Sequence, residues 1–288
     1  MNHSPFLPIL IVGLTFFNLS LSGCNAIRVI FPSSDHDEIA PILPDDMMRP
    51  AILVFSKTNG FRHNEAIAAG VPFFEDMASK RGWGFFSTEN GAVHDKALLD
   101  RFDVVVWFQA SGDVLDLSQR SALTDWIESG GSFFGIHGAG GDPEYDWSWQ
   151  PETLIGAQFT GHPMGPQFQE ATLLIEDPIH PITKHLGQSW VRTEEWYSFA
   201  ESPRASGAEV LATLDESTYS PRIHFLFIDR DISMGGDHPV IWTQCIGRGR
   251  SLYSALGHLE EAYSEPNHQT FLEESIAWLI QMRSSECE

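Results

Sequence analysis

The sequence predicts an α/β domain with a three-layer, doubly wound, mostly parallel sheet and an inserted β-rich segment. The runs 51–55 and 103–108 are almost continuously apolar, as expected of strands buried on both faces of a parallel sheet. Such runs alternate with helical patterns at short spacing, which is typical of doubly wound sheets. A third run, 132–136, leads through His137 into a glycine cluster, which indicates a strand that ends in a sharp turn.

The first half of the domain is predicted to contain four strands and three helices. The strand at 51–55 leads through a loop to a helix that begins at Asn64, the expected N-cap, and runs to about Lys80. Gly82 is placed to end this helix. The remaining elements of this half are expected at 83–88 (strand), 95–101 (helix), 103–108 (strand), 118–129 (helix) and 132–136 (strand).

The pattern changes after residue 165, where β-rich stretches follow one another without predicted helices between them. We expect these stretches to form extra strands inserted before the last strands of the sheet. Pro266 is placed to begin a final amphipathic helix that runs to about Met282. The expected inserted strands are 169–175, 210–214 and 223–228, and the expected last strands are 239–244 and 250–256.

The N-terminus resembles a bacterial lipoprotein signal. Residues 5–24 hold a short apolar stretch that ends in Leu21-Ser22-Gly23-Cys24, which is similar to a lipobox. We therefore expect a signal peptide at 1–23, a lipid on Cys24, a flexible tether at 24–48 and a folded domain at 49–284. This places the protein in the bacterial cell envelope, at the periplasmic or outer surface, with the lipid as its only contact with the membrane. A plain signal peptide or a membrane anchor is the alternative, because no Lys or Arg precedes the apolar stretch.

The charge of the chain argues against nucleic acid and anionic lipid as partners, and its cysteine content argues against one kind of zinc site. The formal net charge is −22, from 39 acidic and 17 basic residues, which repels nucleic acid and anionic lipid. No Cys-x-x-Cys pair occurs, so a structural zinc site of that kind is not expected. A disulfide between Cys245 and Cys287 is possible in an oxidising compartment, but the spacing does not establish it.

Four histidines stand at or near the ends of predicted strands. His63 follows the first strand by one loop, His137 ends the fourth, His162 lies in the glycine-containing stretch 159–163, and His258 ends the last strand. The carboxyl ends of parallel strands meet at one edge of the sheet, so these side chains are expected to share a crevice. All four are candidate metal ligands, with zinc or another divalent ion as the possible cofactor. The i, i+4 spacing of an H-E-x-x-H motif is missing, so the sequence leaves metal binding open.

A second group of candidates combines carboxylates with aromatic rings. Glu194 and Glu195 are adjacent, and burial near histidines would tune such a pair for proton transfer. Trp196 and Tyr197 follow them and offer flat faces on which sugars stack. The alternatives are a solvated loop corner for the carboxylates and ordinary core packing for the rings. Further candidates for substrate binding are Arg62, His162, Glu194 and Asp237, with Tyr145, Trp147 and Trp149 as additional aromatic residues.

Seven ordered blocks of the sequence form a further pattern: 61–63, 135–139, 156–163, 177–183, 194–197, 237–242 and 247–258. Together they make residues 50–283 resemble the ThuA-like (trehalose utilization) family. This resemblance implies a flavodoxin-like, class I glutamine amidotransferase-like fold and a link to disaccharide and keto-sugar metabolism. In this resemblance His137 fills the position of the amidotransferase nucleophile, so glutaminase activity is not implied.

The sequence therefore supports three functional hypotheses. The first is an enzyme that uses acid–base chemistry, with or without a metal, to convert a keto-sugar or glycoside in disaccharide catabolism. Its expected catalytic residues are His137, His63, Glu195 and His258, gathered in one pocket with His137 exposed. The second is a non-catalytic sugar-binding lipoprotein, in which the histidines act as hydrogen-bonding groups. The third is a metal-dependent hydrolase of other esters or amides. A small-molecule carbohydrate is the expected partner in the first two.

Overall fold

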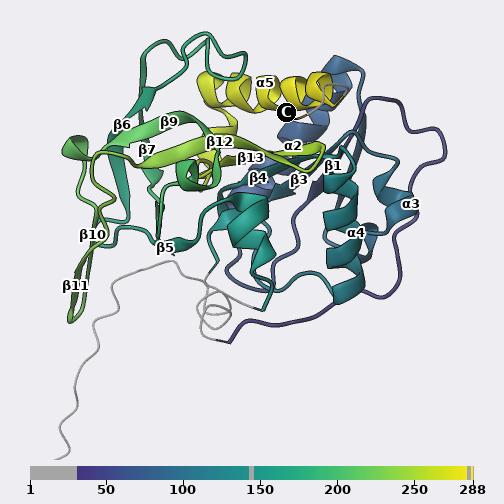
Figure 1. The fold of residues 1–288 in the computed structure, drawn as a ribbon, viewed down its shortest axis with the longest axis horizontal. Coiled ribbons are helices and arrows are strands. Elements are labelled where there is room, and N and C mark those ends of the chain that lie inside the picture. Colours follow the sequence, from purple (N-terminus) through teal and green to yellow (C-terminus); the bar gives the residue numbers. More distant parts are fainter. Residues whose placement is uncertain (1–30, 143–145, 284–286, 288) are drawn as a thin grey trace, which may run out of the picture.

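The computed structural model describes residues 31–142, 146–283 and 287, and its main feature is one nine-stranded mixed sheet (Figure 1). The order of the strands is β2-β1-β3-β4-β13-β12-β9-β6-β7. The predicted signal peptide and Cys24 lie outside the described residues. None of the described helices is both long and apolar enough to cross a membrane.

One half of the sheet is parallel and covered by helices on both faces, as predicted. Helices α2 and α5 lie on one face, and α3 and α4 lie on the other, which gives three layers (Figure 1). This arrangement follows from right-handed crossovers, because the chain moves in opposite directions along the sheet on its two faces. The parallel strands are β2 (Gly84–Thr88), β1 (Ala51–Phe55), β3 (Val104–Phe108), β4 (Ser132–Ile136) and β13 (Gly249–Ser254). The helices are α2 (Asn64–Arg81), α3 (Lys96–Leu99), α4 (Leu117–Glu128) and α5 (Pro266–Met282).

The inserted β-rich segment extends the same sheet with antiparallel strands. Strand β7 was not predicted, because its sequence, Ser-Trp-Val-Arg-Thr-Glu-Glu, is largely polar. It forms because it pairs with β6 at the edge of the sheet, where an exposed face tolerates polar side chains. The antiparallel strands are β12 (Pro239–Ile246), β9 (Glu209–Asp215), β6 (Phe168–Ile175) and β7 (Ser189–Glu195).

The predicted strand at 223–228 is wrong. The chain instead forms a hairpin of two strands, β10 (Arg222–Phe225) and β11 (Ile228–Asp231), which is separate from the main sheet. It reverses at Leu226, which has a φ of 53°, and the side chain of Phe227 is fully exposed. The apolar run therefore lies at the tip of a projecting hairpin rather than in the core.

The remaining elements are short. Strands β5 (Phe159–Gly161) and β8 (Ser198–Phe199) form a second small sheet. The short helices are η1 (Gly91–Val93), η2 (His137–Gly140), η3 (Gln150–Ile155), η4 (Pro203–Ser206), η5 (Glu216–Thr218) and η6 (Glu260–Tyr263).

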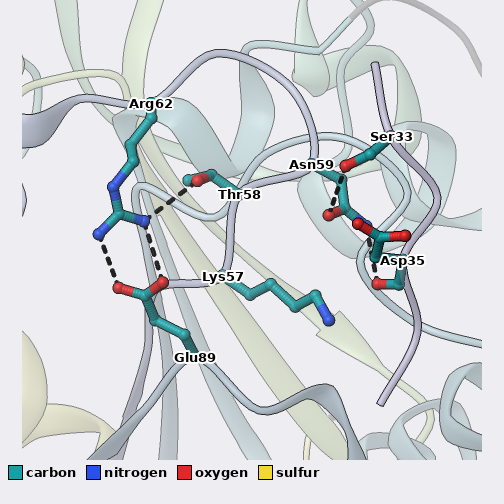
Figure 2. A pocket seen from close by; sticks show the side chains of 7 residues that line it. All are labelled: Ser33, Asp35, Lys57, Thr58, Asn59, Arg62 and Glu89. Atoms are coloured by element: carbon teal, nitrogen blue, oxygen red, sulfur yellow. Dashed lines mark hydrogen bonds and ion pairs between the residues drawn. The ribbon is translucent and has the colours of Figure 1, made fainter. Parts of the chain in front are cut away.

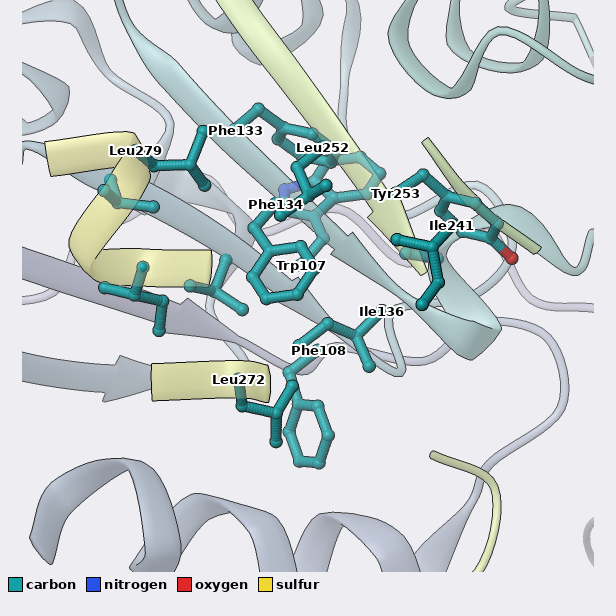
Figure 3. Packing of buried hydrophobic residues seen from close by; sticks show 14 of the residues in the cluster. Trp107, Phe108, Phe133, Phe134, Ile136, Ile241, Leu252, Tyr253, Leu272 and Leu279 are labelled. Carbon is teal, nitrogen blue, oxygen red and sulfur yellow. The ribbon is translucent and has the colours of Figure 1, made fainter. Parts of the chain in front are cut away.

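The core explains why the parallel strands are apolar without alternation. Successive side chains of a strand point to opposite faces, and both faces of this sheet are covered. Phe134 packs against Phe271 of α5, with ring centroids 6.4 Å apart, whereas its neighbour Phe133 packs against Trp107 at 5.7 Å. Figure 3 shows this packing, with Leu272 of α5 beside Phe108.

Residues 31–50 follow the surface of the domain, which differs from the flexible tether expected for 24–48. The amide of Ser33 donates to the carbonyl of Asn59 at 3.0 Å, and Asp37 forms an ion pair with Lys57. Leu43 is 6% exposed and belongs to the hydrophobic core. This buried apolar side chain helps to hold the segment against the domain.

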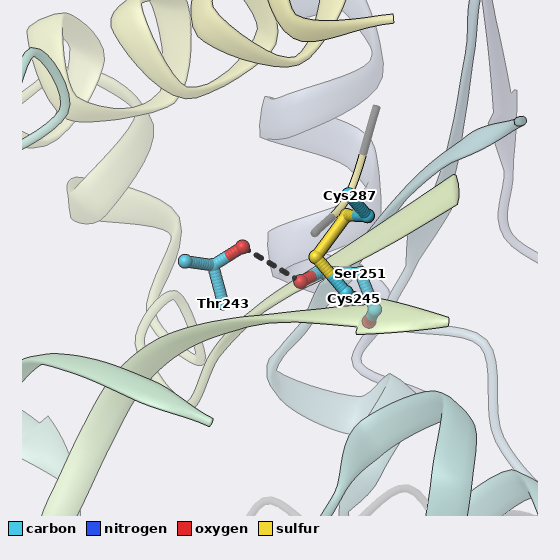
Figure 4. The surroundings of a disulfide bond; sticks show 4 residues. All are labelled: Thr243, Cys245, Ser251 and Cys287. Atoms are coloured by element: carbon cyan, nitrogen blue, oxygen red, sulfur yellow. Dashed lines mark hydrogen bonds between the residues drawn. A yellow bond between two sulfur atoms is a disulfide. The ribbon is translucent and has the colours of Figure 1, made fainter. Parts of the chain in front are cut away.

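The structure contains the disulfide between Cys245 and Cys287, which the sequence suggested but did not establish. Cys245, on β12, is bonded to Cys287, with the two Cα atoms 5.6 Å apart (Figure 4). The bond closes a segment of 42 residues and ties the C-terminus to the sheet. A covalent link of this kind stabilises a fold mainly by restricting the unfolded chain.

His94 makes the stability of the domain depend on pH. It is 1% exposed, its Nδ1 donates to the carbonyl of Gly91, and its Nε2 accepts from the indole of Trp107 at 3.0 Å. The bond from Trp107 requires the neutral ring, because Nε2 must keep its lone pair, and burial lowers the pKa of His94 from 6.5 to about 4. Between these two pH values the unfolded chain binds a proton that the folded protein does not. The free energy of unfolding therefore falls as the pH is lowered through this range.

We expect His94 to account for about 3 kcal/mol of this loss between pH 6.5 and 4. Urea unfolding across this range measures it. A His94→Gln variant keeps an acceptor for the indole of Trp107 but cannot be protonated, so its stability should vary less with pH. Equal pH dependence in the two proteins would contradict the assignment.

Candidate active site

The carboxyl edge of the sheet carries a cluster of three histidines and one glutamate, which we call the His–Glu cluster: His63, His137, Glu195 and His258. His63 follows β1, His137 follows β4, and His258 follows β13, all in the parallel half. Glu195 ends β7, which runs in the same direction as β13 because three antiparallel strands separate them. Each residue has one potential donor atom in a group whose atoms all lie within 4.8 Å of one another. The structure thus brings together the four residues expected to be catalytic.

His137 occupies the predicted elbow between strand and helix, but it is buried rather than exposed as expected. Its exposed fraction is 0%, because the ring of Tyr197 covers one face with centroids 4.2 Å apart. The backbone of His137 has a φ of 46°, a conformation that is costly for a residue with a side chain. Its Nδ1 donates to the carbonyl of Ala255 at 2.7 Å, which fixes the ring and leaves Nε2 to face the cluster.

The glycines after His137 are required by close packing. A Cβ atom on Gly140 would lie 2.5 Å from the ring of Tyr253, and one on Gly141 would lie 2.6 Å from the hydroxyl of Tyr197. The positive φ of the turn falls on His137 itself and not on these two glycines. The glycine cluster therefore allows two tyrosines to support the turn that carries the histidine.

His63 is the N-cap of α2, a position predicted for Asn64. Its side chain makes no capping hydrogen bond and instead packs against the rings of His137 and His258, with centroids 4.9 and 4.6 Å away. It is 6% exposed, and among the described residues its Nδ1 has no hydrogen-bond partner. Burial, followed by the charges of His258 and His137, holds its pKa well below the usual value. The ring is therefore neutral near pH 7.

Glu195 lies at the centre of the cluster. Its Oε2 is 3.0 Å from Nδ1 of His258 and 3.3 Å from Nε2 of His137. Its Oε1 lies 3.2 Å from Nδ1 of His162 and accepts a hydrogen bond from Gln167. Burial raises the pKa of this carboxyl, but the surrounding histidines, above all His258, outweigh burial and hold the pKa well below its usual range. Glu195 is therefore a buried carboxylate anion.

His258 and His162 connect the cluster with solvent. Their side chains are 14% and 27% exposed, whereas those of His137 and Glu195 are almost fully buried. Burial lowers the pKa of His258, but the neighbouring charge of Glu195 outweighs it and raises the pKa above 6.5. Of the two carboxylate oxygens of Glu195, His162 contacts Oε1, the outer one, whereas His137 and His258 contact Oε2, the inner one. His162 therefore lies beside the cluster rather than within it.

Glu194 supports the cluster from behind. It is fully buried, and its carboxylate accepts from the amides of Gly257 at 2.9 Å and His258 at 3.1 Å. Arg192 donates to the same carboxylate at 2.9 Å. These bonds hold the turn that carries His258. The geometry therefore gives Glu194 a positioning role, whereas the sequence analysis expected it to bind substrate.

The predicted sugar-stacking residues lie in the core. Trp196 is fully buried, and its indole donates to the carbonyl of Gln169 at 2.8 Å. Tyr197 is 4% exposed and covered by His137 and Phe159, so neither ring offers an open face. Trp147 stacks on Trp149 and packs against Trp107, on the face of the sheet opposite α5; Tyr145 lies outside the described residues.

Arg62 and Asp237 also lie apart from the cluster. Arg62 forms a two-pronged ion pair with Glu89 and lines a polar cavity of about 370 Å³, which Figure 2 shows. Asp237 pairs with Arg204 at 3.1 Å on the surface. The cavity is lined by Ser33, Asp35, Lys57, Thr58, Asn59, Arg62 and Glu89.

Sequence reasoning missed two supporting residues, Gln109 and Gln167. Gln109 directly follows β3, has a φ of 57°, and donates to the carbonyl of Gly257 at 2.7 Å while accepting from the amide of Gly138 at 3.1 Å. It thus joins the turns of His137 and His258. A polar residue directly after an apolar strand was the signal that identified His137, and it applies to Gln109 as well. Gln167 carried no such signal, because it lies in an irregular loop.

Comparison with family profiles identifies the family of the chain. The profile of the ThuA family, described as trehalose utilisation, matches residues 51–279. The chain belongs to the ThuA family. Comparison with functionally curated proteins gave no significant match.

Solved structures agree with this family and with the predicted fold. A ThuA-like protein from Bacteroides uniformis superposes with a TM-score of 0.68 at 22% identity, over 83% of this chain and 95% of that one. A ThuA-like protein from Parabacteroides merdae gives 0.59 at 14% identity, over 84% and 93%. The β-galactosidase of Rahnella sp. R3 gives 0.50 at 13% identity, over 81% of this chain but 31% of that enzyme. At these identities the matches establish the fold of this ThuA protein, the amidotransferase-like α/β sheet.

A Glu194→Gln substitution tests the positioning role of that residue. The amide would place a donor against the N–H groups of Gly257 and His258 or against Arg192, and it would remove the charge that compensates the arginine. We expect the free energy of unfolding to fall by about 3 kcal/mol. Urea unfolding measures the change. A Glu170→Gln control on the exposed face of β6 should change it by less than about 0.5 kcal/mol. Equal effects in both variants would contradict the role.

Proposed function

We propose that this ThuA protein is an enzyme that converts a keto-sugar or a keto-glycoside in disaccharide catabolism by proton transfer next to the carbonyl group. The observation that carries the proposal is the His–Glu cluster, in which three imidazoles and a carboxylate share one small volume. Imidazole gains and loses protons near neutral pH, which suits the removal of a proton next to a carbonyl. The trehalose utilisation of the family supports a sugar as the substrate.

The chemistry requires a base and an acid on the two sides of the reacting bond. In a keto-glycoside, the base removes a proton from the carbon next to the carbonyl and an enolate forms. Its electron pair then expels the glycosidic oxygen, which takes a proton from the acid and leaves as the second sugar. In a keto-sugar without this leaving group, reprotonation at the neighbouring carbon gives an isomer. His258 and His162 are the partly exposed imidazoles from which these protons can exchange with solvent.

The structure favours an enzyme over a sugar-binding lipoprotein. A binding protein needs open aromatic faces and neutral hydrogen-bonding groups, whereas the two rings expected to stack on sugar, Trp196 and Tyr197, are buried. The cluster instead concentrates titratable groups around a buried carboxylate, and perturbed pKa values of this kind are typical of catalytic sites.

Turnover of keto-disaccharides tests the proposal. We expect the protein to convert at least one member of a panel of oxidised disaccharides that includes 3-keto-trehalose, with product detected by mass spectrometry. His137→Ala and Glu195→Gln should each lower kcat by about 10²–10⁴-fold, because each removes a group of the cluster. A His224→Ala control on the exposed hairpin strand β10 should stay within about twofold.

Two outcomes would contradict the proposal. One is tight, unchanged binding of the sugars without conversion, which is the behaviour of a binding lipoprotein. The other is full turnover by folded His137→Ala protein, which would place the chemistry outside the cluster.

We also propose that the protein is anchored to the cell envelope through a lipid on Cys24. The lipobox-like sequence motivates this proposal, and the disulfide between Cys245 and Cys287 supports an oxidising compartment. Ser33 is the first described residue with a backbone bond to the domain, nine positions after Cys24. Such a short linker spans at most about 30 Å, so an anchored domain would stay near the membrane.

A Cys24→Ser substitution tests the anchor. We expect the wild-type protein to sediment with membranes and the variant to be released into the soluble fraction. Mass spectrometry of the wild-type N-terminus should find a lipid-modified Cys24. A wild-type protein that is soluble and begins at another residue would contradict the lipid anchor.

A further inference from the structure

We propose that the His–Glu cluster is a mononuclear binding site for a divalent first-row transition metal, with zinc as the expected ion. The donor atoms are Nε2 of His137, Nδ1 of His258, Oε2 of Glu195 and one ring nitrogen of His63. Three imidazoles and one carboxylate form a donor set typical of zinc and its neighbours in the first transition row.

The first argument is that N–H protons alone cannot satisfy the cluster while Glu195 is ionised. Three atoms form a triangle: His137 Nε2 to His258 Nδ1 is 3.1 Å, His258 Nδ1 to Glu195 Oε2 is 3.0 Å, and His137 Nε2 to Glu195 Oε2 is 3.3 Å. If His137 Nε2 and His258 Nδ1 both carry protons directed at the carboxylate, their two N–H groups face each other. If only one of them carries a proton, the lone pair of the other nitrogen faces a lone pair of Glu195 Oε2. A cation between the three atoms turns all three contacts into ligand–ligand distances of one coordination sphere.

The second argument is that the distances fit a metal. Zinc lies about 2.0–2.1 Å from nitrogen and oxygen ligands, so the ligands of a tetrahedral site are about 3.3 Å apart. The sides of the triangle, 3.0 to 3.3 Å, match this spacing and the slightly shorter one of higher coordination. His137, His258 and Glu195 thus stand close to ligand positions without rearrangement, and the donor atom of His63 lies within 4.8 Å of them.

The third argument is the outer shell of the cluster. Metal-binding histidines usually donate their second nitrogen to a carbonyl or carboxylate, which fixes the ring and turns the other nitrogen toward the ion. His137 does this through its bond to Ala255, which turns Nε2 toward the cluster. The outer oxygen of Glu195 is held by Gln167 and His162, so its inner oxygen is left to act as a single ligand.

The fourth argument concerns His63. Its ring is 6% exposed, and among the described residues its Nδ1 has no partner. A buried polar atom without a partner costs free energy, and coordination of the ring would return some of that cost. His63 supplies the fourth donor, whereas the sequence analysis included His162 in the set and left Glu195 out.

The binding of a metal ion by the cluster is independent of the proposed function, whereas a role of the ion in turnover rests on that function. In that reaction the ion would polarise the carbonyl of the keto-sugar and stabilise the negative charge of the enolate. The four residues of the cluster would then be bound to the ion. His162, the imidazole beside this set of ligands, would therefore accept the proton removed from the carbon next to the carbonyl.

Metal analysis of the full chain, purified without chelator and without a histidine tag, tests the site. We expect about one equivalent of a divalent transition ion per chain by mass spectrometry of the elements. Metal-free protein should take up one equivalent of Zn²⁺ or Co²⁺, and Co²⁺ should produce visible absorption bands of nitrogen and oxygen coordination. His63→Ala and His137→Ala should each lower the bound metal below a tenth of an equivalent at the same free ion concentration.

Two matched variants locate the site. His224→Ala, which removes an exposed imidazole of the hairpin, should bind one equivalent as the wild type does. His162→Gln should also reach one equivalent, but with affinity lowered about 10–100-fold, because it removes an outer-shell partner. Circular dichroism shows whether each variant is folded. If a variant is not folded, the Co²⁺ spectrum of the wild type still shows whether nitrogen and oxygen atoms coordinate the ion.

The outcomes separate this inference from the proposed function. Folded wild-type protein that takes up none of Zn²⁺, Co²⁺, Ni²⁺ or Mn²⁺, or metal that is retained in both His63→Ala and His137→Ala, would overturn the metal site. Turnover by protein shown to be metal-free would overturn the role of the ion while supporting the enzyme. Stoichiometric metal without conversion of any keto-sugar would support the site and contradict the proposed function.

Discussion

The buried carboxylate of Glu195 is the group on which the rest of the site depends. Removing an anion from water is costly unless opposite charge and hydrogen bonds compensate it. Here His137, His258 and His162 surround the two oxygens, and Gln167 completes the set. Each of these partners is held by its own bond or strand end, so the requirement of one anion orders several loops at the carboxyl edge of the sheet.

Two adjacent glutamates divide this work, because neighbouring side chains of a strand point in opposite directions. Glu195 faces the three histidines, while Glu194 is turned to the amides of Gly257 and His258 and to Arg192. Both arrive on β7, which belongs to the inserted antiparallel segment. The insertion is therefore what completes the site: the parallel half contributes the histidines, and the extension contributes the carboxylates.

A fold of this kind does not by itself determine the reaction. The elbow after β4 has the strained backbone of a nucleophile turn, but it holds His137, which is buried and hydrogen-bonded to Ala255. Of the two aromatic residues that looked suited to sugar stacking, Tyr197 instead packs on His137 in this elbow, and Trp196 is buried in the core.

The sequence by itself determined the parallel strands, their helices and the histidines at their ends, because burial on both faces and sharp turns leave local patterns. It also placed Glu195 among the catalytic candidates. Only the tertiary structure decided that His162 stands outside the cluster and that Trp196 and Tyr197 are buried. It also decided that 223–228 is a projecting hairpin and that 31–50 packs on the domain. These features depend on pairing between distant segments. β7 shows the reason most clearly: its polar sequence has no strand pattern of its own, and its pairing with β6 brings Glu195 to the histidines.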